Sequence, residues 1–580
     1  VLSDYKSGEQ QSIAPQAKRG FVNELKYRFN WNSPIVGSPH SKNTVYVGSN
    51  HLFQSRDFGK SWEPISPDLT TNNPEKLKPA GGPVWYDNST AENHCTIISI
   101  GESPRKPGLV WAGTDDGNVQ VTRDGGKTWT NVARSVPGVP EGSPVSHVEP
   151  SRTSDDTAYI AFDRHLLDDY APHIFKTTDG GKTWMRLVDG LPAKAYVHIV
   201  REDPKNTNLL YAGTELGLFV SFDGGKKWQP MSFKNLPPVA VHDIVIHPRE
   251  NDLILGTHGR SIVILDDITP LQQMTPEIAS KNAHLFAPRH AWRYASPMRT
   301  YGGGNKLYSG PNPPYGALLT YYLKEKLDPK AVLKLEILDS TGKVLKSVDR
   351  LTRDAGINRV AWDLREEGPT FRTPPEPRLV EMGFAGSRGP QALPGTYTAR
   401  LTVNSETFEQ KVEVRLDPSL KATPKDLELQ QTTARRVRDM MSSLNTGLRR
   451  MDALKAQLRE IEKNGKEAQP KQAADITKAV DGMVKEIDEV SGKLAVKIGG
   501  SRLEDPPRLS EAIGGLFTAV SGGNSAPTST QLAYLEELAP QHKQGMEAIN
   551  GLLAKAQKEW LPQLQKLGLS LLPAAAPVTQ

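Results

Sequence analysis

The octapeptide TRDGGKTW at residues 122–129 is spelled almost identically at three other places in the chain. The copies read SRDFGKSW at 55–62, TTDGGKTW at 177–184 and SFDGGKKW at 221–228. Their aspartates are 67, 55 and 44 residues apart, which is the spacing of a repeated supersecondary unit. A run of alternating apolar residues precedes the copies, as in GLVWAGTDDGNVQVT. The octapeptide therefore marks one end of a repeating β unit.

Each unit reads as four short strands with turn residues between them. A strand closed by proline is followed by a strand ending in a G-T-x-x-G-type turn, a third strand, the octapeptide and a last strand. Four strands in about 40–65 residues is the pattern of a β-propeller blade. We count about five blades in residues 1–270, so the fold class is mainly β. Propellers usually close with more blades, which removes their sheet edges, so this set is predicted to be incomplete.

The residue types of the octapeptide point to a structural role. Aspartate accepts hydrogen bonds from nearby backbone N–H and hydroxyl groups, glycine supplies a positive φ, and tryptophan covers the neighbouring strand. A catalytic aspartate would not be needed four times at peripheral turns. We therefore interpret four aspartates and four tryptophans as structural: Asp57 and Trp62, Asp124 and Trp129, Asp179 and Trp184, and Asp223 and Trp228.

The rest of the chain divides by pattern into four further segments. Residues 271–312 are rich in proline and glycine and read as a linker, and strand patterns over 313–417 predict an immunoglobulin-like β-sandwich. Three- and four-residue spacing predicts an α-helical domain over 418–565, beginning with Thr423 as the N-cap before Pro424. Residues 566–580 are expected to form a flexible tail.

Composition excludes several classes of protein. The 71 basic and 66 acidic residues are spread along the chain, so no basic tract predicts binding to nucleic acid. No apolar run is long enough for a membrane span. The single cysteine, Cys95, lies in an apolar strand and is expected to be buried. The chain begins without methionine, inside what reads as an outer hairpin, so the missing blades are expected from an upstream part of its precursor or from a partner chain.

At these residues the sequence resembles a known group. The octapeptide is similar to the Asp-box, or bacterial neuraminidase (BNR) repeat, of sialidases, sortilin-type propellers and tandem-propeller xyloglucanases. The resemblance extends through VREDPKNTNLLYAGTELGLFVSFDGG and LGTHGRSIVILDD to the second half of large secreted bacterial sortilin-like proteins, often labelled glycosyl hydrolases. It implies a bacterial protein that is secreted, periplasmic or held at the cell surface. The Arg-Ile-Pro segment of sialidases is absent, so we reject that activity.

Candidate site residues lie in the turns after the second strand of the units. GTDDG carries Asp115 and Asp116 and GTELG carries Glu215, and these carboxylates are the candidates for catalysis. GTHGR carries His258 and Arg260, which we expect to bind a ligand at the mouth of the propeller channel.

Two further hypotheses concern an ion and the ligand itself. Asp168 and Asp169 in HLLDDYAPH are candidates for binding Ca²⁺, and no other cofactor is expected. The leading hypothesis is a non-catalytic binding protein or scaffold that holds a protein or glycan through propeller loops. The alternatives are an inverting glycoside hydrolase acting on a polysaccharide and a sortilin-like peptide binder.

Overall fold

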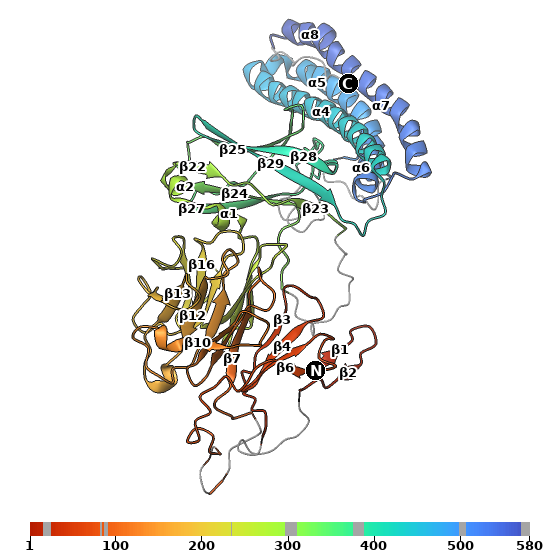
Figure 1. Ribbon diagram of the computed structural model, residues 1–580. Helices are drawn as coiled ribbons and strands as arrows, with labels where there is room; N and C mark the ends of the chain where they lie inside the picture. Colours follow the sequence, from red (N-terminus) through yellow and green to blue (C-terminus); the bar gives the residue numbers. More distant parts are fainter. Residues whose placement is uncertain are drawn as a thin grey trace. The chain divides into compact units, whose positions relative to one another are not determined.

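The computed structural model consists of two compact units, Val1–Ala279 and Ser280–Gln580. Figure 1 labels many of the helices and strands of both units. The residues that the structure describes are 1–15, 25–79, 81, 84–85, 91–231, 233, 235–295, 310–374, 388–497 and 506–569.

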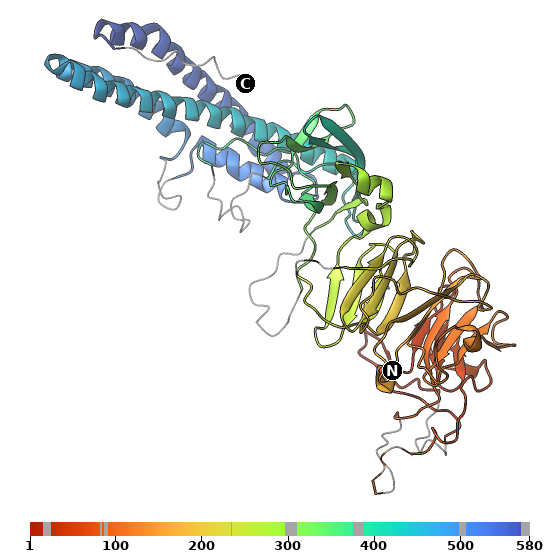
Figure 2. The same cartoon turned by 90° about the vertical axis from the view of Figure 1, so that its left-hand side faces the viewer.

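Among its described residues, the first unit contains five successive antiparallel sheets of three or four strands besides a short two-stranded hairpin. These sheets confirm the predicted mainly β fold with five blades. Within each of these sheets the strands pair in chain order, as blades of a propeller do. Figure 2 shows the sheets of this unit following one another. The first blade consists of β3 (Ile35–Gly37), β4 (Val45–Gly48), β5 (Leu52–Ser55) and β6 (Glu63–Pro64). The second consists of β7 (Ile97–Glu102), β8 (Val110–Thr114), β9 (Val119–Thr122) and β10 (Thr130–Asn131). The third consists of β11 (His147–Pro150), β12 (Ala158–Phe162), β13 (His173–Thr177) and β14 (Met185–Arg186). The fourth consists of β15 (Val197–Glu202), β16 (Leu210–Thr214), β17 (Gly217–Ser221) and β18 (Gln229–Pro230). The fifth consists of β19 (Val241–Ile246), β20 (Leu253–Thr257) and β21 (Ile262–Leu265).

The second strand of the middle blades is buried on both faces. Every residue of β8, β12 and β16 is buried, because each of these strands lies between two neighbouring blades. Apolar clusters join successive blades, and one of them packs Tyr159 of the third blade with Leu210 and Phe219 of the fourth. The face-to-face packing of blades is therefore the core of this unit.

A repeated hydrogen bond also joins the blades. The Tyr46 hydroxyl of the first blade donates to Glu102 of the second at 3.1 Å. The Tyr159 hydroxyl of the third blade donates to Glu202 of the fourth at 3.3 Å. Glu202 is almost completely buried and also accepts from the Arg152 backbone N–H at 2.7 Å. Each of these buried carboxylates thus has partners on the preceding blade, which burial of a charge requires.

The octapeptides form turns that fix the outer edge of each blade. Asp124 Oδ1 accepts from the Thr122 hydroxyl at 2.8 Å and from the Thr128 backbone N–H at 2.9 Å, and Asp124 Oδ2 accepts from the Thr128 hydroxyl at 2.7 Å. Asp57 and Asp179 accept the same set of hydrogen bonds. Asp223 accepts from the Ser221 hydroxyl and the Lys227 backbone N–H, but lysine at 227 has no hydroxyl to donate the third bond. The two glycines after Asp124 have φ of 74° and 98°, which glycine adopts without strain.

The tryptophans of the octapeptides reach the preceding blade. The indole N–H of Trp228 donates to the Leu187 carbonyl at 3.0 Å, and that of Trp129 donates to the Ile65 carbonyl at 3.2 Å. Trp62 makes the same bond at 2.7 Å to Ile13, which follows the short hairpin of β1 (Leu2–Ser3) and β2 (Gln10–Gln11). The first residues of the chain therefore occupy the position that the outer strands of a preceding blade would take.

Acid is expected to weaken these turns over a defined pH range. Hydrogen bonds from the backbone N–H and the hydroxyl of Thr128 hold the pKa of Asp124 at about 2, below its usual 3.8. Because the folded-state pKa is depressed, this stabilisation is complete above about pH 4 and is lost as the pH falls towards about 2. Asp124→Asn should lower the unfolding temperature at pH 6, and its difference from the wild type should vanish near pH 2 in thermal scans by circular dichroism. Asp189→Asn, at an exposed turn, should show no such difference at either pH.

The second unit begins with a β-sandwich of two sheets. One has the order β22 (Ala283–Leu285), β24 (Ala317–Leu323) and β27 (Gly356–Trp362). The other has the order β23 (Ala291–Arg293), β29 (Glu406–Leu416), β28 (Gly395–Val403), β25 (Leu333–Leu338) and β26 (Val344–Ser347). Side chains of both sheets, such as Leu319, Trp362 and Leu401, share one apolar core.

The segment predicted as a linker, 271–312, contains helices and strands among its described residues, which corrects that prediction. Two short helices, α1 (Thr269–Gln273) and α2 (Pro276–Ser280), come first. β22 then pairs with β24, and β23 pairs in parallel with β29, so both strands belong to the sandwich. Strands of three residues are too short to show an alternating pattern, and therefore the sequence did not reveal them. Residues 296–309 of this segment lie outside the described residues.

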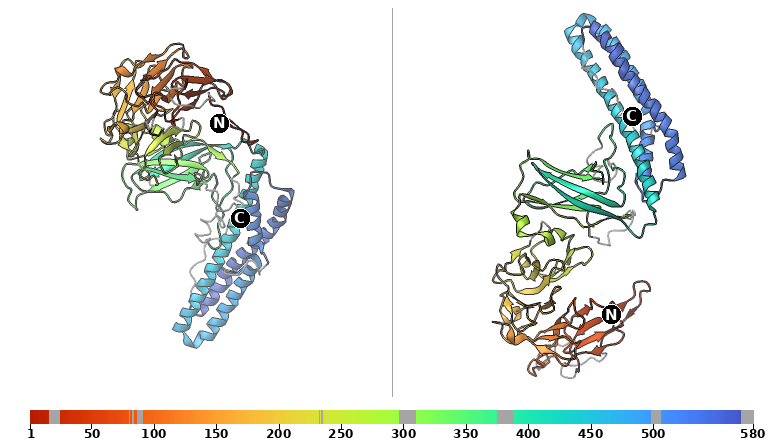
Figure 3. Two further views of the ribbon diagram at one scale, coloured as in Figure 1. Left: turned by 90° about the horizontal axis from the view of Figure 1, so that it is seen from below. Right: turned by 45° about the horizontal axis from the view of Figure 1, so that its top comes forward.

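The sandwich is followed by helices that lie side by side (Figure 3). They are α4 (Pro424–Ala468), α5 (Ala473–Leu494), α6 (Leu509–Ser521), α7 (Ser529–Lys555), the π-helical turn η5 (Ala556–Trp560) and α8 (Leu561–Lys566). The predicted N-cap is confirmed, since the Thr423 hydroxyl accepts from the Asp426 backbone N–H and the Asp426 side chain accepts in return. Among the described residues, no helix is long and apolar enough to cross a bilayer. Most of the predicted tail, 570–580, lies outside the described residues.

Candidate functional site

Four blades place one polar residue at the same turn. Asp115, Asp163, Glu215 and His258 each follow the second strand of a blade. The backbone N–H of each donates to a carbonyl just before or at the start of the first strand of its blade, those of Thr96, Pro144, Tyr196 and Ala240 respectively. Because these four turns are equivalent, their side chains gather at one end of the blades.

Two histidines come to the same end through β-bulges. The pairing of β15 with β16 is irregular between Val197 and Ile199, so His198 is the extra residue there. The pairing of β19 with β20 is irregular between Val241 and Asp243, so His242 is the extra residue there. A bulge turns its extra side chain out of the regular alternation, which aims both imidazoles at the turns of the neighbouring strands.

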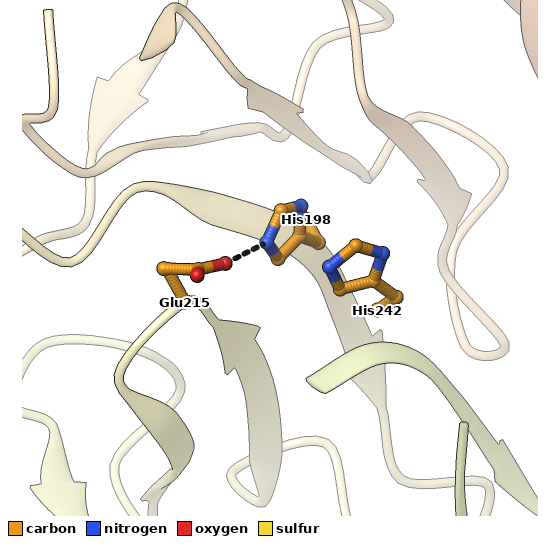
Figure 4. A group of neighbouring side chains, drawn as sticks. All are labelled: His198, Glu215 and His242. Carbon is orange, nitrogen blue, oxygen red and sulfur yellow. Dashed lines mark hydrogen bonds and ion pairs between the residues drawn. The ribbon is translucent and has the colours of Figure 1, made fainter. Parts of the chain in front are cut away.

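The five residues Asp163, His198, Glu215, His242 and His258 form what we call the histidine cluster. His198 Nε2 lies 3.3 Å from Glu215 Oε2, and His198 Nδ1 lies 3.4 Å from Asp163 Oδ2. The rings of His198 and His242 have centroids 3.9 Å apart, and the ring of His258 follows at 5.0 Å from His242. Figure 4 shows the Glu215 carboxylate and the His242 ring on two sides of His198.

The surroundings of His242 favour the neutral form of its imidazole. Burial, and then the charges of His198 and His258, lower the pKa of His242. Asp163 is held in its charged form, because hydrogen bonds from His198 and His165 outweigh its burial and lower its pKa. His242 therefore binds a proton less readily than a free imidazole and lies in a cluster with the carboxylates of Asp163 and Glu215.

Aromatic rings border the cluster. The ring of Tyr196 stacks on His165 at 4.7 Å between centroids, and Tyr170 lies 6.1 Å from Tyr196. His165 is held by Asp163, whose Oδ1 lies 2.6 Å from His165 Nδ1. Burial and the neighbouring Glu215 raise the pKa of Tyr196 to about 12, so its hydroxyl stays protonated at neutral pH. We call Tyr170, Tyr196 and His165 the aromatic shelf.

The other two carboxylates proposed for catalysis have their oxygens engaged. Asp115 accepts from the Thr96 backbone N–H and hydroxyl, both at 2.8 Å, and lies 3.4 Å from His94. Asp116 accepts from the Thr71 backbone N–H at 2.7 Å and hydroxyl at 2.6 Å, and from the Thr114 hydroxyl at 2.6 Å. Both carboxylates are buried and hold loops of the chain in place, whereas the Glu215 side chain is 40% exposed.

The remaining predicted site residues lie around the cluster or in the loop after β12. The exposed Arg260 follows His258 by two residues and donates to the Gly259 carbonyl. Asp169 accepts from Arg164 at 2.8 Å and from the Ala171 backbone N–H at 3.0 Å, while Asp168 is exposed. Among the described residues, neither aspartate belongs to a group of three side chains able to hold a metal ion. The Ca²⁺ hypothesis thus gains no support from the surroundings of Asp168 and Asp169.

Sequence reasoning missed Asp163, Tyr196, His198 and His242. Their signal lies in aligning the units strand by strand, because AYVHIV at 195–200 and AVHDIV at 240–245 place a histidine at the same bulge. Asp163 stands where the GT turns carry Asp115 and Glu215, although its own unit lacks the Gly-Thr pair. The equivalence of these positions appears only when the strands of successive units are aligned.

Comparison with known proteins gives similarity without a family. No family model matches the chain. The oligoxyloglucan-reducing end-specific xyloglucanase of Emericella nidulans is 23% identical over 268 residues, which are 41% of this chain and 32% of that protein, so the chain spans about a third of its length.

Solved structures show the same kind of distant similarity. The GH74 xyloglucanase of Xanthomonas campestris has a TM-score of 0.31 and 15% identity, covering 64% of this chain and 57% of that one. A YCF48 protein bound to D1 peptide has a TM-score of 0.27 and 16% identity, covering 41% of this chain and 70% of that one. Scores this low assign the chain to no family.

Proposed function

We propose that the propeller unit is a carbohydrate-binding unit that takes an oligosaccharide at the histidine cluster and the aromatic shelf. The observation that carries the proposal is the convergence of Glu215, His242 and His258 with Tyr196 and Tyr170 at one end of the blades. Aromatic rings offer apolar faces, and the carboxylate and imidazoles offer directional hydrogen bonds, which is the usual composition of a small-molecule site. A xyloglucanase among the distant relatives supports a sugar ligand.

Hydrolysis of a polysaccharide is the second candidate, and the same relative favours it over a purely structural role. Inverting glycosidases need two carboxyl groups roughly 6.5–9.5 Å apart, one as acid and one as base. Asp163 lies next to Nδ1 of His198 and Glu215 lies next to its Nε2, so the imidazole ring separates the two carboxylates. Asp163 already faces His165 and His198, however, which favours binding over acid catalysis at this position.

Binding is tested with xyloglucan oligosaccharides by isothermal titration calorimetry on the full chain in the presence of a chelator. Glu215→Gln should weaken binding about tenfold or more, because a hydrogen bond to a charged group contributes about 1.5–3 kcal/mol. Glu63→Gln, on the exposed outer strand β6, should leave the affinity unchanged. No binding by the wild type, or equal losses in both variants, would contradict the proposal. Release of reducing sugar that Glu215→Gln abolishes would establish the hydrolase instead.

Three sequence predictions stay open within this proposal. A peptide ligand would show itself as binding of an extended peptide that Tyr196→Ala abolishes while oligosaccharides fail to bind.

A carbohydrate ligand agrees with the predicted location outside the bacterial cytoplasm. Completion of the propeller by further blades remains a prediction, in line with the exposed apolar residues Val245, Ile262 and Ile264 on the last blade.

A further inference from the structure

His198 lies between two carboxylates, which constrains where its proton can be. Its Nδ1 faces Asp163 Oδ2 at 3.4 Å and its Nε2 faces Glu215 Oε2 at 3.3 Å. A neutral imidazole carries one N–H and one lone pair. If Nδ1–H donates to Asp163, the lone pair of Nε2 points at the carboxylate oxygen of Glu215. At this distance, either a shared proton or a bound metal ion can link the nitrogen to the carboxylate oxygen.

A metal ion would satisfy more of this site than a proton would. A proton on Nε2 would serve His198 and Glu215 alone. One ligand atom from each of His198, Glu215 and His242 lies within 4.8 Å of the others, so a single ion could contact all three (Figure 4). We propose that His198, Glu215 and His242 bind a divalent transition-metal ion of the Zn²⁺ type. The proposal goes beyond the proposed sugar binding and does not depend on it.

The distances agree with such an ion. Zn²⁺ holds imidazole nitrogen and carboxylate oxygen at about 2.0–2.2 Å, so neighbouring donors of a tetrahedral site lie about 3.3–3.5 Å apart. The separation of His198 Nε2 and Glu215 Oε2 is 3.3 Å. All three ligand atoms lie within 4.8 Å of one another, so the exposed His242 side chain has to move closer to complete a tetrahedral set.

The surroundings match a metal site in two further respects. Metal-binding histidines usually donate their other ring N–H to a carboxylate, which fixes the tautomer, and Asp163 stands in that place for His198. Two histidines with one carboxylate are donors that suit Zn²⁺, Ni²⁺ or Cu²⁺, whereas Ca²⁺ takes oxygen ligands. His258, with its ring 5.0 Å from that of His242, lies where a fourth donor could come from.

The test is titration of the chelator-treated full chain with Zn²⁺ by calorimetry, without any sugar, and with Co²⁺ by visible absorption. We expect one Zn²⁺ per chain with micromolar or tighter affinity, and a Co²⁺ spectrum typical of four ligands. His242→Ala and Glu215→Gln should each weaken binding at least tenfold. Asp163 is not a proposed ligand but supports His198 and His165, and Asp163→Asn should weaken binding about tenfold. His242 is exposed, so its variant should fold, and circular dichroism verifies this.

His40→Ala is the matched control, because His40 is an exposed histidine of the first blade. It should bind Zn²⁺ like the wild type. Absence of saturable binding at one equivalent, or an equal loss in His40→Ala and His242→Ala, would overturn the proposal. The sugar assay is run with chelator and this assay without sugar, so failure of one leaves the other intact.

Discussion

Replacing Trp228 with alanine is expected to lower the free energy of unfolding of the propeller unit by about 3–5 kcal/mol. The Trp228 side chain is only 2% exposed and packs with Tyr159, Leu187 and Phe219 between the third and fourth blades. Its indole N–H also donates to the Leu187 carbonyl at 3.0 Å. The substitution therefore leaves a large cavity and an unpaired buried carbonyl, two costs that add. Urea unfolding followed by circular dichroism measures the loss.

Trp62→Ala provides the comparison for this prediction. Trp62 holds the same position in the first octapeptide and donates the same kind of bond, to Ile13, but it is only partly buried. Since the energy of a truncated side chain follows the apolar area that it buries, we expect Trp62→Ala to cost less than half as much as Trp228→Ala. Equal losses would mean that the hydrogen bond, rather than the packing between blades, carries the contribution of these tryptophans.

The fold was largely predictable because its decisive signals are local. The octapeptide needs only eight residues to show its chemistry, and the Thr423 cap needs four, from Thr423 to Asp426. The two short strands β22 and β23 depend instead on partners about 40 and more than 100 residues away along the chain, at Tyr321–Leu323 and Val414–Leu416. Tertiary pairing of this kind leaves no periodic pattern in three residues.

The sequence predicted only some residues of the candidate site, because the others depend on how distant parts of the chain pair. Glu215 and His258 follow directly from the turn at which they stand, and the same reasoning singled out Asp115 and Asp116. What separates the two pairs is the chain opposite, since Thr71 and Thr96 occupy the oxygens of Asp116 and Asp115. A turn motif predicts the backbone position of a side chain. Whether that side chain can bind a ligand depends on hydrogen-bond partners that lie far away in the sequence. The bulges that expose His198 and His242 are likewise visible only once the strands are paired.

Glu366→Ala is the second large effect that we expect, and it concerns the second unit. Glu366 follows β27 of the sandwich, and its carboxylate is 3% exposed. It accepts from Arg435 at 2.5 Å, from Arg438 at 3.2 Å and from Gln431 at 3.0 Å, all on α4. Removing one member of a buried ion pair costs 3–5 kcal/mol, because the remaining charges lose their partner. Arg435 is 41% exposed and can turn towards water, which places the expected cost at the lower end, about 3 kcal/mol.

Glu367→Ala tests whether burial is the cause. Glu367 is the next residue, pairs with Lys346 at 3.1 Å and has a side chain that is 57% exposed. Exposed pairs contribute at most about 1 kcal/mol, so this variant should unfold at nearly the same urea concentration as the wild type. If both variants lost the same stability, the charge of this segment would matter and its burial would not. If Glu366→Ala alone unfolds early, and the helices lose protection from hydrogen exchange together with the sandwich, then the buried carboxylate makes a large contribution to the attachment of α4. It accepts hydrogen bonds from three α4 side chains.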